Sequence, residues 1–361
     1  MQEYVMGNGA IALGALAAGV NLVAGYPGTP SSEILETISK YRHDGVYIEW
    51  SVNEKAAMEV AAAAAYSGAR AMVTMKQVGL NVAADPLMSL AYVGVKGGMV
   101  IVSADDPGPI SSQTEQDTRR FADFCRIPVF DPSSPEEAYK MIGEAFEYSE
   151  KYNTPVLFRP TTRVCHAYAS IDNCDSPSPK KYEGFVKDSK KWVIFPRLSF
   201  ANHIMIEKRN VEIGKDFSTY SANKAEGVNS EKAVVTSGIS YAYTKECLKD
   251  YPDVKLIKIA TAYPFPEDFV LSSLEGAKEV LCIEELSPFI EEQILKLTGK
   301  HGLQLKVSGK LDGKVQAGGE NSTDKIAAIL GDFLGKDFTA DGYDLSDAPA
   351  LPVRPPVLCA G

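Results

Sequence analysis

The first 170 residues alternate between short apolar segments and longer segments with helical periodicity, and this alternation constrains the fold more than any other feature. The apolar segments span four to six residues and are largely apolar at successive positions, which is typical of strands covered on both faces. Strands of this kind separated by helices predict a doubly wound α/β domain. The predicted strands are Leu22–Gly25, Val46–Trp50, Ala71–Met75, Met99–Ser103 and Pro155–Pro160.

Helix signals fill the gaps between these strands. Asn53 is expected to cap a helix over Glu54–Tyr66, and a second helix is predicted over Pro135–Lys151. At the N-terminus, Asn8 is the expected cap of a helix ending at Gly19, and Thr29-Pro30 the expected start of the next one. The uncharged stretch 6–32 contains Gly and Pro residues that would break a membrane span, and no basic region precedes it, so we predict a buried helix followed by a buried strand.

The remaining chain divides into three parts. Residues 171–230 lack clear periodicity and are predicted to form a connecting segment with some local structure. Residues 231–310 are predicted to form a second, smaller α/β domain, and residues 311–361, rich in Gly, Asp and then Pro, a linker. The predicted elements of the second domain are strands at Ala233–Thr236, Leu256–Ala260 and Glu279–Ile283 and helices at Tyr241–Lys249 and Glu291–Thr298.

Composition excludes several classes of function. The net charge of -10 and the pI of about 5.1 argue against nucleic acid or anionic membrane as a partner. Six scattered cysteines form no C-x-x-C pair, which predicts reduced thiols in a cytoplasmic protein. The four histidines have no metal spacing, and no cysteine run suits an iron–sulfur cluster, so no metal ligand is predicted in this chain.

Three segments could carry chemistry. GYPGTPSSEI (25–34) joins a strand to a helix through a tight turn, where hydroxyls and backbone donors could bind an anion, although helix capping explains the same residues and is favoured by spacing alone. Glu54 opens a helix of mostly small residues, which would allow a close subunit contact; a solvated first-turn carboxylate is the simpler interpretation. Asp105-Asp106 could hold a metal but cap turns more often, and Ser111–Arg120 is either a solvated loop or the rim of a site.

Together these segments resemble one family. GYPGTPSSEI, EWSVNEKAAMEVA, ARAMVTMKQVGLNVAADPLMSLAYVGVKGG, ADDPGP, SSQTEQDTR and PVLFRPTTRV are similar to the alpha subunit of indolepyruvate:ferredoxin oxidoreductases, in that family's order, and cover most of residues 1–170. Residues 231–290 resemble, more weakly, the transketolase C-terminal-like domain that follows. The closing RPPVLCAG resembles the lead-in to the family's next domain.

The resemblance implies a thiamine diphosphate-dependent reaction. Members convert an aryl 2-oxoacid, coenzyme A and oxidised ferredoxin to an acyl-CoA, carbon dioxide and reduced ferredoxin. Residues 1–170 would be the pyrimidine-binding domain, and Glu54 matches the catalytic glutamate that hydrogen-bonds the aminopyrimidine ring. The other residues that the resemblance assigns are Tyr26, Pro30, Gln77 and Asn81 to the cofactor, and Thr29 and Arg119 to the substrate, although no motif fixes the role of Arg119.

The sequence also departs from the full family pattern. It carries no G-D-G…N signature for magnesium and the diphosphate, and no ferredoxin-like cysteine clusters. Magnesium and [4Fe-4S] clusters are therefore expected in a region or partner outside this chain. The expected partners are a diphosphate-binding domain or chain, a beta (gamma-type) subunit, ferredoxin and a second copy of the pyrimidine domain. Alternative hypotheses are a pyruvate or branched-chain 2-oxoacid oxidoreductase subunit and a non-catalytic assembly module.

Overall fold

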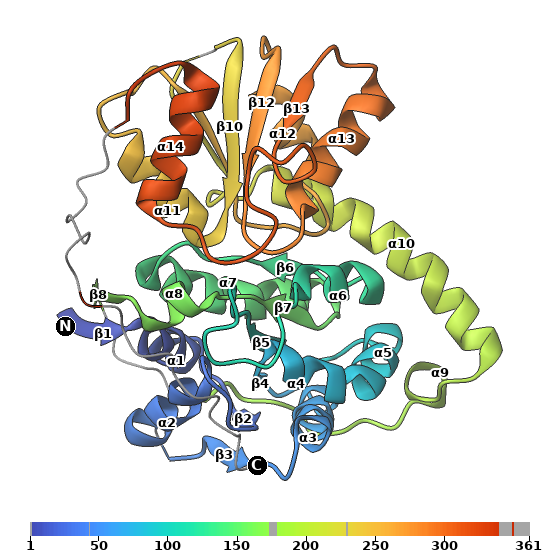
Figure 1. The fold of residues 1–361 in the computed structure, drawn as a ribbon. Coiled ribbons are helices and arrows are strands. Elements are labelled where there is room, and N and C mark those ends of the chain that lie inside the picture. Colours follow the sequence, from blue (N-terminus) through green and yellow to red (C-terminus); the bar gives the residue numbers. More distant parts are fainter. Residues whose placement is uncertain (1, 43, 173–178, 229, 339–348, 350–361) are drawn as a thin grey trace.

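The protein folds into two stacked α/β lobes with a long helix along one side (Figure 1). The structure, a computed structural model, describes residues 2–42, 44–172, 179–228, 230–338 and 349. The first lobe contains a six-stranded parallel sheet of order β3-β2-β4-β5-β7-β6, which confirms the predicted doubly wound class. Its strands are β2 (Leu22–Gly25), β3 (Tyr47–Trp50), β4 (Ala71–Lys76), β5 (Met99–Ala104), β6 (Val129–Phe130) and β7 (Val156–Phe158).

Helices cover both faces of this sheet because successive strand residues point to opposite sides. Met72 and Val100 pack in the core formed with α1, α2 and α7, whereas Val73 and Ile101 pack in the core formed with α3 and α5. The helices of this lobe are α1 (Gly7–Ala17), α2 (Ser32–Tyr41), α3 (Glu54–Tyr66), α4 (Gln77–Val82), α5 (Ala84–Val93), α6 (Thr118–Cys125), α7 (Pro135–Tyr152) and α8 (Thr162–His166).

The N-terminal region differs from the prediction in two details. Asn8 does not cap α1: the helix begins at Gly7, and the buried Asn8 amide donates to the Pro30 carbonyl at 2.6 Å and to Glu33 Oε2 at 2.8 Å. The second helix begins at Ser32, so Pro30 lies before it rather than in its first turn. A two-stranded antiparallel sheet of β1 (Gln2–Met6) and β8 (Tyr168–Asp172), which no periodicity predicted, closes the lobe.

The second lobe is larger than predicted. Its five-stranded sheet has the order β13-β12-β10-β11-β9, with β9 antiparallel to β11. The domain therefore starts near Lys224, not at residue 231, and helix α14 (Thr323–Leu334) extends it beyond residue 310. The strands are β9 (Lys224–Glu226), β10 (Lys232–Ser237), β11 (Lys255–Ile259), β12 (Glu279–Ile283) and β13 (Lys306–Ser308), and the other helices are α11 (Gly238–Cys247), α12 (Glu267–Ser273) and α13 (Phe289–His301).

The assignment of residues 311–334 to a linker is thus wrong. Ser322 caps α14 by accepting from the Lys325 amide, and Ile326 and Leu330 pack against Val234 of the sheet. The capping serine and the amphipathic spacing were present in the sequence, but the Gly-rich stretch before them concealed the helix. The rest of the predicted linker, residues 339–348 and 350–361 including RPPVLCAG, lies outside the described residues.

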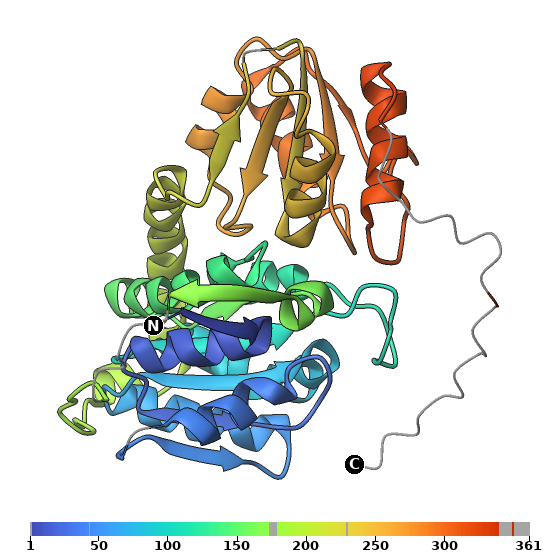
Figure 2. The ribbon, with the colours of Figure 1, turned by 90° about the vertical axis from the view of Figure 1, so that its left-hand side faces the viewer.

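The connecting segment contains α9 (Ser189–Trp192) and α10 (Pro196–Ser218), and α10 contacts both α5 of the first lobe and α12 of the second (Figure 2). Within the part of the chain that the structure describes, no helix is both long and apolar enough to cross a bilayer. The described cysteines form no disulfide; they are Cys125, Cys165, Cys247 and Cys282, while Cys174 and Cys359 lie outside the described residues.

The carboxyl ends of the two sheets meet where the lobes dock. The Val129 amide donates to the Tyr263 carbonyl at 2.7 Å, and the Asp131 amide donates to the Ala260 carbonyl at 2.8 Å. Asp131 follows β6, and Ala260 follows β11. The second lobe therefore covers the β5-β7-β6 half of the first sheet's carboxyl edge and leaves the β3-β2-β4 half to be considered as a site.

Candidate active site

The uncovered half of the edge contains the topological switch point of the sheet. Strands β2 and β4 are neighbours, but the chain leaves β2 toward β3 on one side and leaves β4 toward β5 on the other. Open α/β sheets bind ligands in the crevice outside such a pair of strand ends. The two loops that the sequence singled out, 26–31 after β2 and 77–81 after β4, begin at these ends.

Glycines bring these two loops together. A Cβ added at Gly25 would lie 2.4 Å from Thr74 Oγ1, and one added at Gly28 would lie 3.0 Å from the Lys76 side chain. The turn therefore lies directly against the end of β4. Within the turn, the Gly28 amide donates to Ser32 Oγ at 2.8 Å and Ser31 Oγ donates to the Gly28 carbonyl at 2.9 Å.

The other predicted residues of this turn differ in accessibility. Thr29 is exposed and Tyr26 is half-buried, so both side chains can reach a ligand in the crevice. Pro30 is buried, and its carbonyl accepts from Asn8. Pro30 thus shapes the turn and forms part of its wall.

Glu54 is a buried carboxylate, and the interpretation as a solvated first-turn residue is wrong. It opens α3, whose cap Asn53 accepts from the Ala56 amide at 2.9 Å, and Glu54 itself is only 7% exposed. Its carboxylate lies over Gly79 of α4, because a Cβ added at Gly79 would be 2.5 Å from Glu54 Oε1. A glycine at position 79 is what allows the carboxylate to occupy this place beside the switch-point crevice.

The loop between β5 and α6 closes the crevice on the other side. Gln77 is fully buried; its Nε2 donates to the Thr114 carbonyl at 3.1 Å, and its Oε1 accepts from Ser112 Oγ at 3.3 Å. Asn81 is exposed and donates to Gln116 Oε1 at 3.0 Å. Gln77 and Asn81 are thus joined to one loop, which forms the rim of the candidate site rather than a free solvated segment.

Asp105 and Asp106 hold that loop. Asp106 Oδ2 accepts from the amides of Ser111 and Ser112 at 2.8 and 2.9 Å, the turn-capping alternative for this pair. Asp105 accepts from Thr118 Oγ1 at 2.8 Å and from Arg159 Nε at 2.7 Å. Burial raises the pKa of Asp105 to about 6, although the Arg159 charge opposes this shift.

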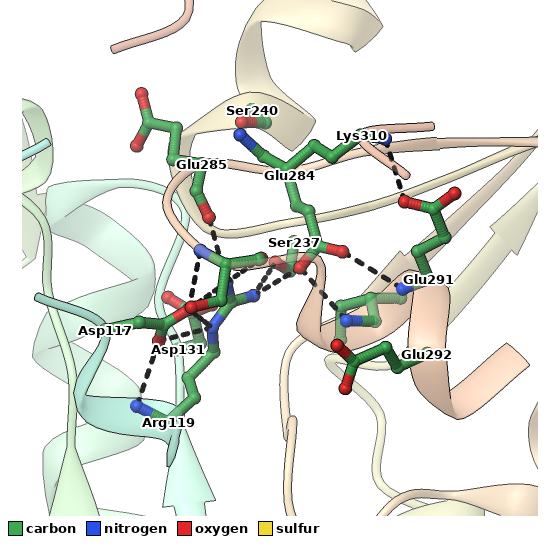
Figure 3. Close-up of polar contacts among 12 residues, drawn as sticks. Asp117, Arg119, Asp131, Ser237, Ser240, Glu284, Glu285, Glu291, Glu292 and Lys310 are labelled. Atoms are coloured by element: carbon green, nitrogen blue, oxygen red, sulfur yellow. Dashed lines mark hydrogen bonds and ion pairs between the residues drawn. The ribbon is translucent and has the colours of Figure 1, made fainter. Parts of the chain in front are cut away.

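Arg119 does not have the position expected of a substrate ligand. Its side chain is fully buried at the lobe interface (Figure 3). Nε and Nη2 donate to Asp117, Nη1 donates to Glu284 Oε2 at 2.8 Å, and Nη2 also donates to the carbonyls of Glu285 and Ser287 at 2.9 and 3.1 Å. The guanidinium is engaged by protein groups, so a substrate carboxylate has no access to it in this structure.

The interface around Arg119 is rich in carboxylates. Burial tends to raise the pKa of Asp117, but the Arg119 charge and hydrogen bonds dominate and lower it to about 2. Burial raises the pKa of Glu285 to about 7 against the opposing hydrogen bond from the Asn321 amide. Burial also raises the pKa of Glu284 and of Asp131, although Arg119 and Arg159 oppose the shift.

Sequence reasoning missed several of these residues. Gly79 was signalled only as a glycine inside a short helical segment, which alone has no clear meaning. Glu284 and Glu285 follow directly after the apolar strand β12, and polar residues in that place could have been marked as carboxyl-edge residues. Their partner Arg119 lies 165 residues earlier in the chain, a pairing that no single-sequence pattern indicates.

Comparisons with known proteins agree with this geometry. Residues 13–227 match the family described as pyruvate flavodoxin/ferredoxin oxidoreductase, thiamine diphosphate-binding. The chain belongs to this family. The match includes α2, α3, α4 and the loop before α6, and so contains all the predicted site residues.

Curated relatives refine the placement within the family. Indolepyruvate oxidoreductase subunit IorA of Methanothermobacter marburgensis is 38% identical over 99% of this chain, and that of Thermococcus kodakarensis is 40% identical over 98%. This chain spans only 58% and 57% of the lengths of those two proteins. The predicted resemblance to the N-terminal part of the indolepyruvate oxidoreductase alpha subunit is confirmed.

A solved structure supports the fold across both lobes. The 2-oxoglutarate:ferredoxin oxidoreductase from Magnetococcus marinus, determined with 2-oxoglutarate, coenzyme A and succinyl-CoA bound, superposes with a TM-score of 0.72. The match covers 92% of this chain and 65% of that one at 16% identity, a level that shows the fold alone.

Proposed function

We propose that this chain provides the pyrimidine-binding half of a thiamine diphosphate site in an enzyme that oxidatively decarboxylates aryl 2-oxoacids, indolepyruvate in particular, to acyl-CoA with reduction of ferredoxin. The observation that carries the proposal is the buried Glu54 carboxylate beside the switch-point crevice. A buried carboxylate next to a ligand crevice is suited to sharing a proton with a heterocyclic nitrogen. Family membership and the IorA relatives support the same choice of cofactor and substrate.

The residues around Glu54 fit the flat, polar edge of an aminopyrimidine. Gly79 leaves room beside the carboxylate, and Gln77 holds the rim loop in place. When bound, thiamine diphosphate supplies the carbon nucleophile and electron sink for decarboxylation. Glu54 would accept and return a proton at a pyrimidine ring nitrogen, while Tyr26, Pro30 and Asn81 would line the cofactor and Thr29 would face the 2-oxoacid.

The rest of the enzyme is proposed to come from elsewhere. The relatives extend well beyond the matched part, and this sequence has neither the G-D-G…N signature nor ferredoxin-like cysteine clusters. Magnesium, the diphosphate anchor and [4Fe-4S] clusters would reside in a complementing domain or chain, with a beta (gamma-type) subunit and ferredoxin as further partners. A second copy would pack against the small residues of α3, in a cytoplasmic assembly.

A different 2-oxoacid is the main alternative for the substrate. The 2-oxoglutarate synthase subunit KorA of Methanocaldococcus jannaschii is 26% identical over 77% of this chain, and a pyruvate or branched-chain 2-oxoacid remains open as well. The lower identity favours an aryl 2-oxoacid. A non-catalytic assembly module is disfavoured because a buried glutamate without a ligand would cost stability for no gain.

The test is a calorimetric titration of thiamine diphosphate and magnesium into this chain, alone and mixed with a chain that carries the diphosphate-binding domain. Binding in the mixture only, together with indolepyruvate-dependent reduction of ferredoxin, supports the proposal. Glu54→Gln should abolish turnover, and Glu59→Gln, an exposed carboxylate on the same helix, is the matched control. A folded mixture that neither binds cofactor nor reduces ferredoxin would favour the assembly module.

A further inference from the structure

Arg119 joins the candidate active-site rim to the second lobe. On its own lobe it binds Asp117, the residue that caps α6 and directly follows the rim loop 111–116. On the other lobe it binds Glu284 and the carbonyls of Glu285 and Ser287. Asp117 completes the junction, because its Oδ2 accepts from the Ser287 amide at 3.1 Å.

The same contacts continue from the loop to Glu54. Thr114 and Ser112 of the loop hold the Gln77 amide on both of its ends. Gln77 opens α4, and Gly79 of the same helix lies under the Glu54 carboxylate. A connected set of packed and hydrogen-bonded groups therefore runs from the second lobe to the candidate catalytic residue, which is the physical requirement for coupling between them.

Little apolar packing holds the loop against the second lobe. A cavity of about 270 Å³ is lined on one side by Glu115, Gln116 and Asp117 and on the other by residues 286–288 and Ala317. Beside this cavity, polar tethers carry the junction: the Arg119 cluster, and Glu115 Oε1, which accepts from the Gly319 amide at 2.8 Å. Loss of a tether should therefore loosen the loop more than it loosens either lobe.

We propose that Arg119 is a positioning residue: by binding Asp117 and the 284–287 segment at once, it makes docking of the second lobe set the rim loop against Gln77 and Glu54. This inference rests on the proposed function for its catalytic meaning, but not for its structural content. The role needs a guanidinium, because three separate acceptor groups are bound through a planar fork of donors that lysine does not have.

The neighbouring Arg120 is a matched control. It also bridges the lobes, through a bidentate pair with Glu292 at 2.6 and 2.7 Å. Its side chain is 37% exposed, and its pair does not include Asp117 or the rim loop. Arg120→Lys therefore changes a cross-lobe ion pair of the same chemistry without altering the proposed connection to the site.

The first experiment measures amide hydrogen exchange in this chain alone, for Arg119→Lys and Arg120→Lys. Exchange of the 111–116 amides should increase in Arg119→Lys by about two- to thirtyfold, the range expected for a residue on a coupling network. Exchange in β4 and β5 should stay at the wild-type rate, and Arg120→Lys should leave the loop unchanged. An unchanged loop in Arg119→Lys, or an equal increase throughout both lobes, would overturn the inference.

The second experiment uses the assembly with the complementing chain. Arg119→Lys should raise the thiamine diphosphate concentration at half-saturation by the same factor, with kcat at saturating cofactor close to wild type because Glu54 is intact. A general loss of folded enzyme would lower kcat and leave half-saturation unchanged, which contradicts a positioning role. If even the wild-type assembly binds no cofactor, the proposed function fails, and the exchange experiment still decides the positioning of the loop.

Discussion

The two halves of one sheet edge have different roles in this protein. At the carboxyl ends of β3, β2 and β4, Thr29, Asn53 and Asn81 are exposed and Glu54 stands beside a crevice. At the carboxyl ends of β5, β7 and β6, Asp105, Arg159 and Asp131 are buried under the second lobe. The same edge of a parallel sheet can therefore bind a ligand at one end and dock a domain at the other.

Charge separates the two halves further. In the covered half, Arg159 binds Asp105 at 2.7 Å and Asp131 at 3.2 Å, and Arg119 binds Asp117 and Glu284. Buried carboxylates need such partners or a proton, because burial of an unpaired charge is costly. In the open half, a ligand can share the proton of the buried carboxylate. The following predictions test this division, from the largest expected effect to the smallest.

Replacement of the open-half carboxylate should affect catalysis and not folding. Glu54→Gln keeps the size of the side chain but removes the proton acceptor, so kcat in the assembled enzyme should fall by about a hundred- to ten-thousandfold. The melting temperature of the chain should remain within about 2 °C of wild type. A large loss of stability in Glu54→Gln would show that the carboxylate belongs to the fold rather than to the reaction.

Replacement of the covered-half guanidinium should have the opposite result. Arg159→Ala leaves Asp105 and Asp131 buried without their cation, and removal of one partner of a buried ion pair costs about 3–5 kcal/mol of unfolding free energy. Urea denaturation monitored by circular dichroism would measure the change. A loss below about 1 kcal/mol would mean that the interface is hydrated in solution and that the two halves differ less than proposed.

Gly79→Ala tests the space beside Glu54. The added Cβ would lie 2.5 Å from Glu54 Oε1, so the carboxylate must move away from its place in the crevice. Overpacking of this kind costs about 1–3 kcal/mol. We expect thiamine diphosphate binding in the assembly to weaken by about tenfold or more, measured by calorimetry. Gly143→Ala, where the added Cβ would be 3.8 Å from its nearest neighbour, is the control.

Glu285→Gln tests the protonation of the covered half. The pKa of Glu285 is about 7 in the folded protein and near 4.3 in an unfolded chain. Glu285 therefore contributes stability at low pH that is lost as the pH rises through about 7. Glu285→Gln should be nearly neutral near about pH 5 and should stabilise the protein by about 2 kcal/mol near about pH 8. Urea denaturation at both pH values measures this, and an equal effect at both would contradict the raised pKa.

The smallest effect is expected at the rim of the interface. Arg120→Ala removes a cross-lobe ion pair whose side chains are 37% and 33% exposed. Exposed pairs contribute about 0–1 kcal/mol because water screens them. Its unfolding free energy should therefore change far less than that of Arg159→Ala. If the two variants were equally unstable, burial would not explain the difference between the interface pairs.

The sequence by itself determined the local elements and the catalytic candidate. Strands β2 and β12 and helix α3 have the predicted bounds, because short apolar runs, a capping Asn and an alanine-rich helix are local signals. The class of the fold followed from the same alternation. Glu54 was found through the resemblance of long, ordered strings, since its spacing alone favoured a solvated residue.

Only the tertiary structure decided where the polar groups lie. The burial of Glu54 depends on a glycine of another helix, and Asn8 serves the turn at Pro30 rather than the start of its own helix. Arg119 is a junction between lobes because its partner Glu284 arrives from 165 residues away. Such pairings arise from the docking of folded units, whereas sequence patterns report only the interactions of neighbours along the chain.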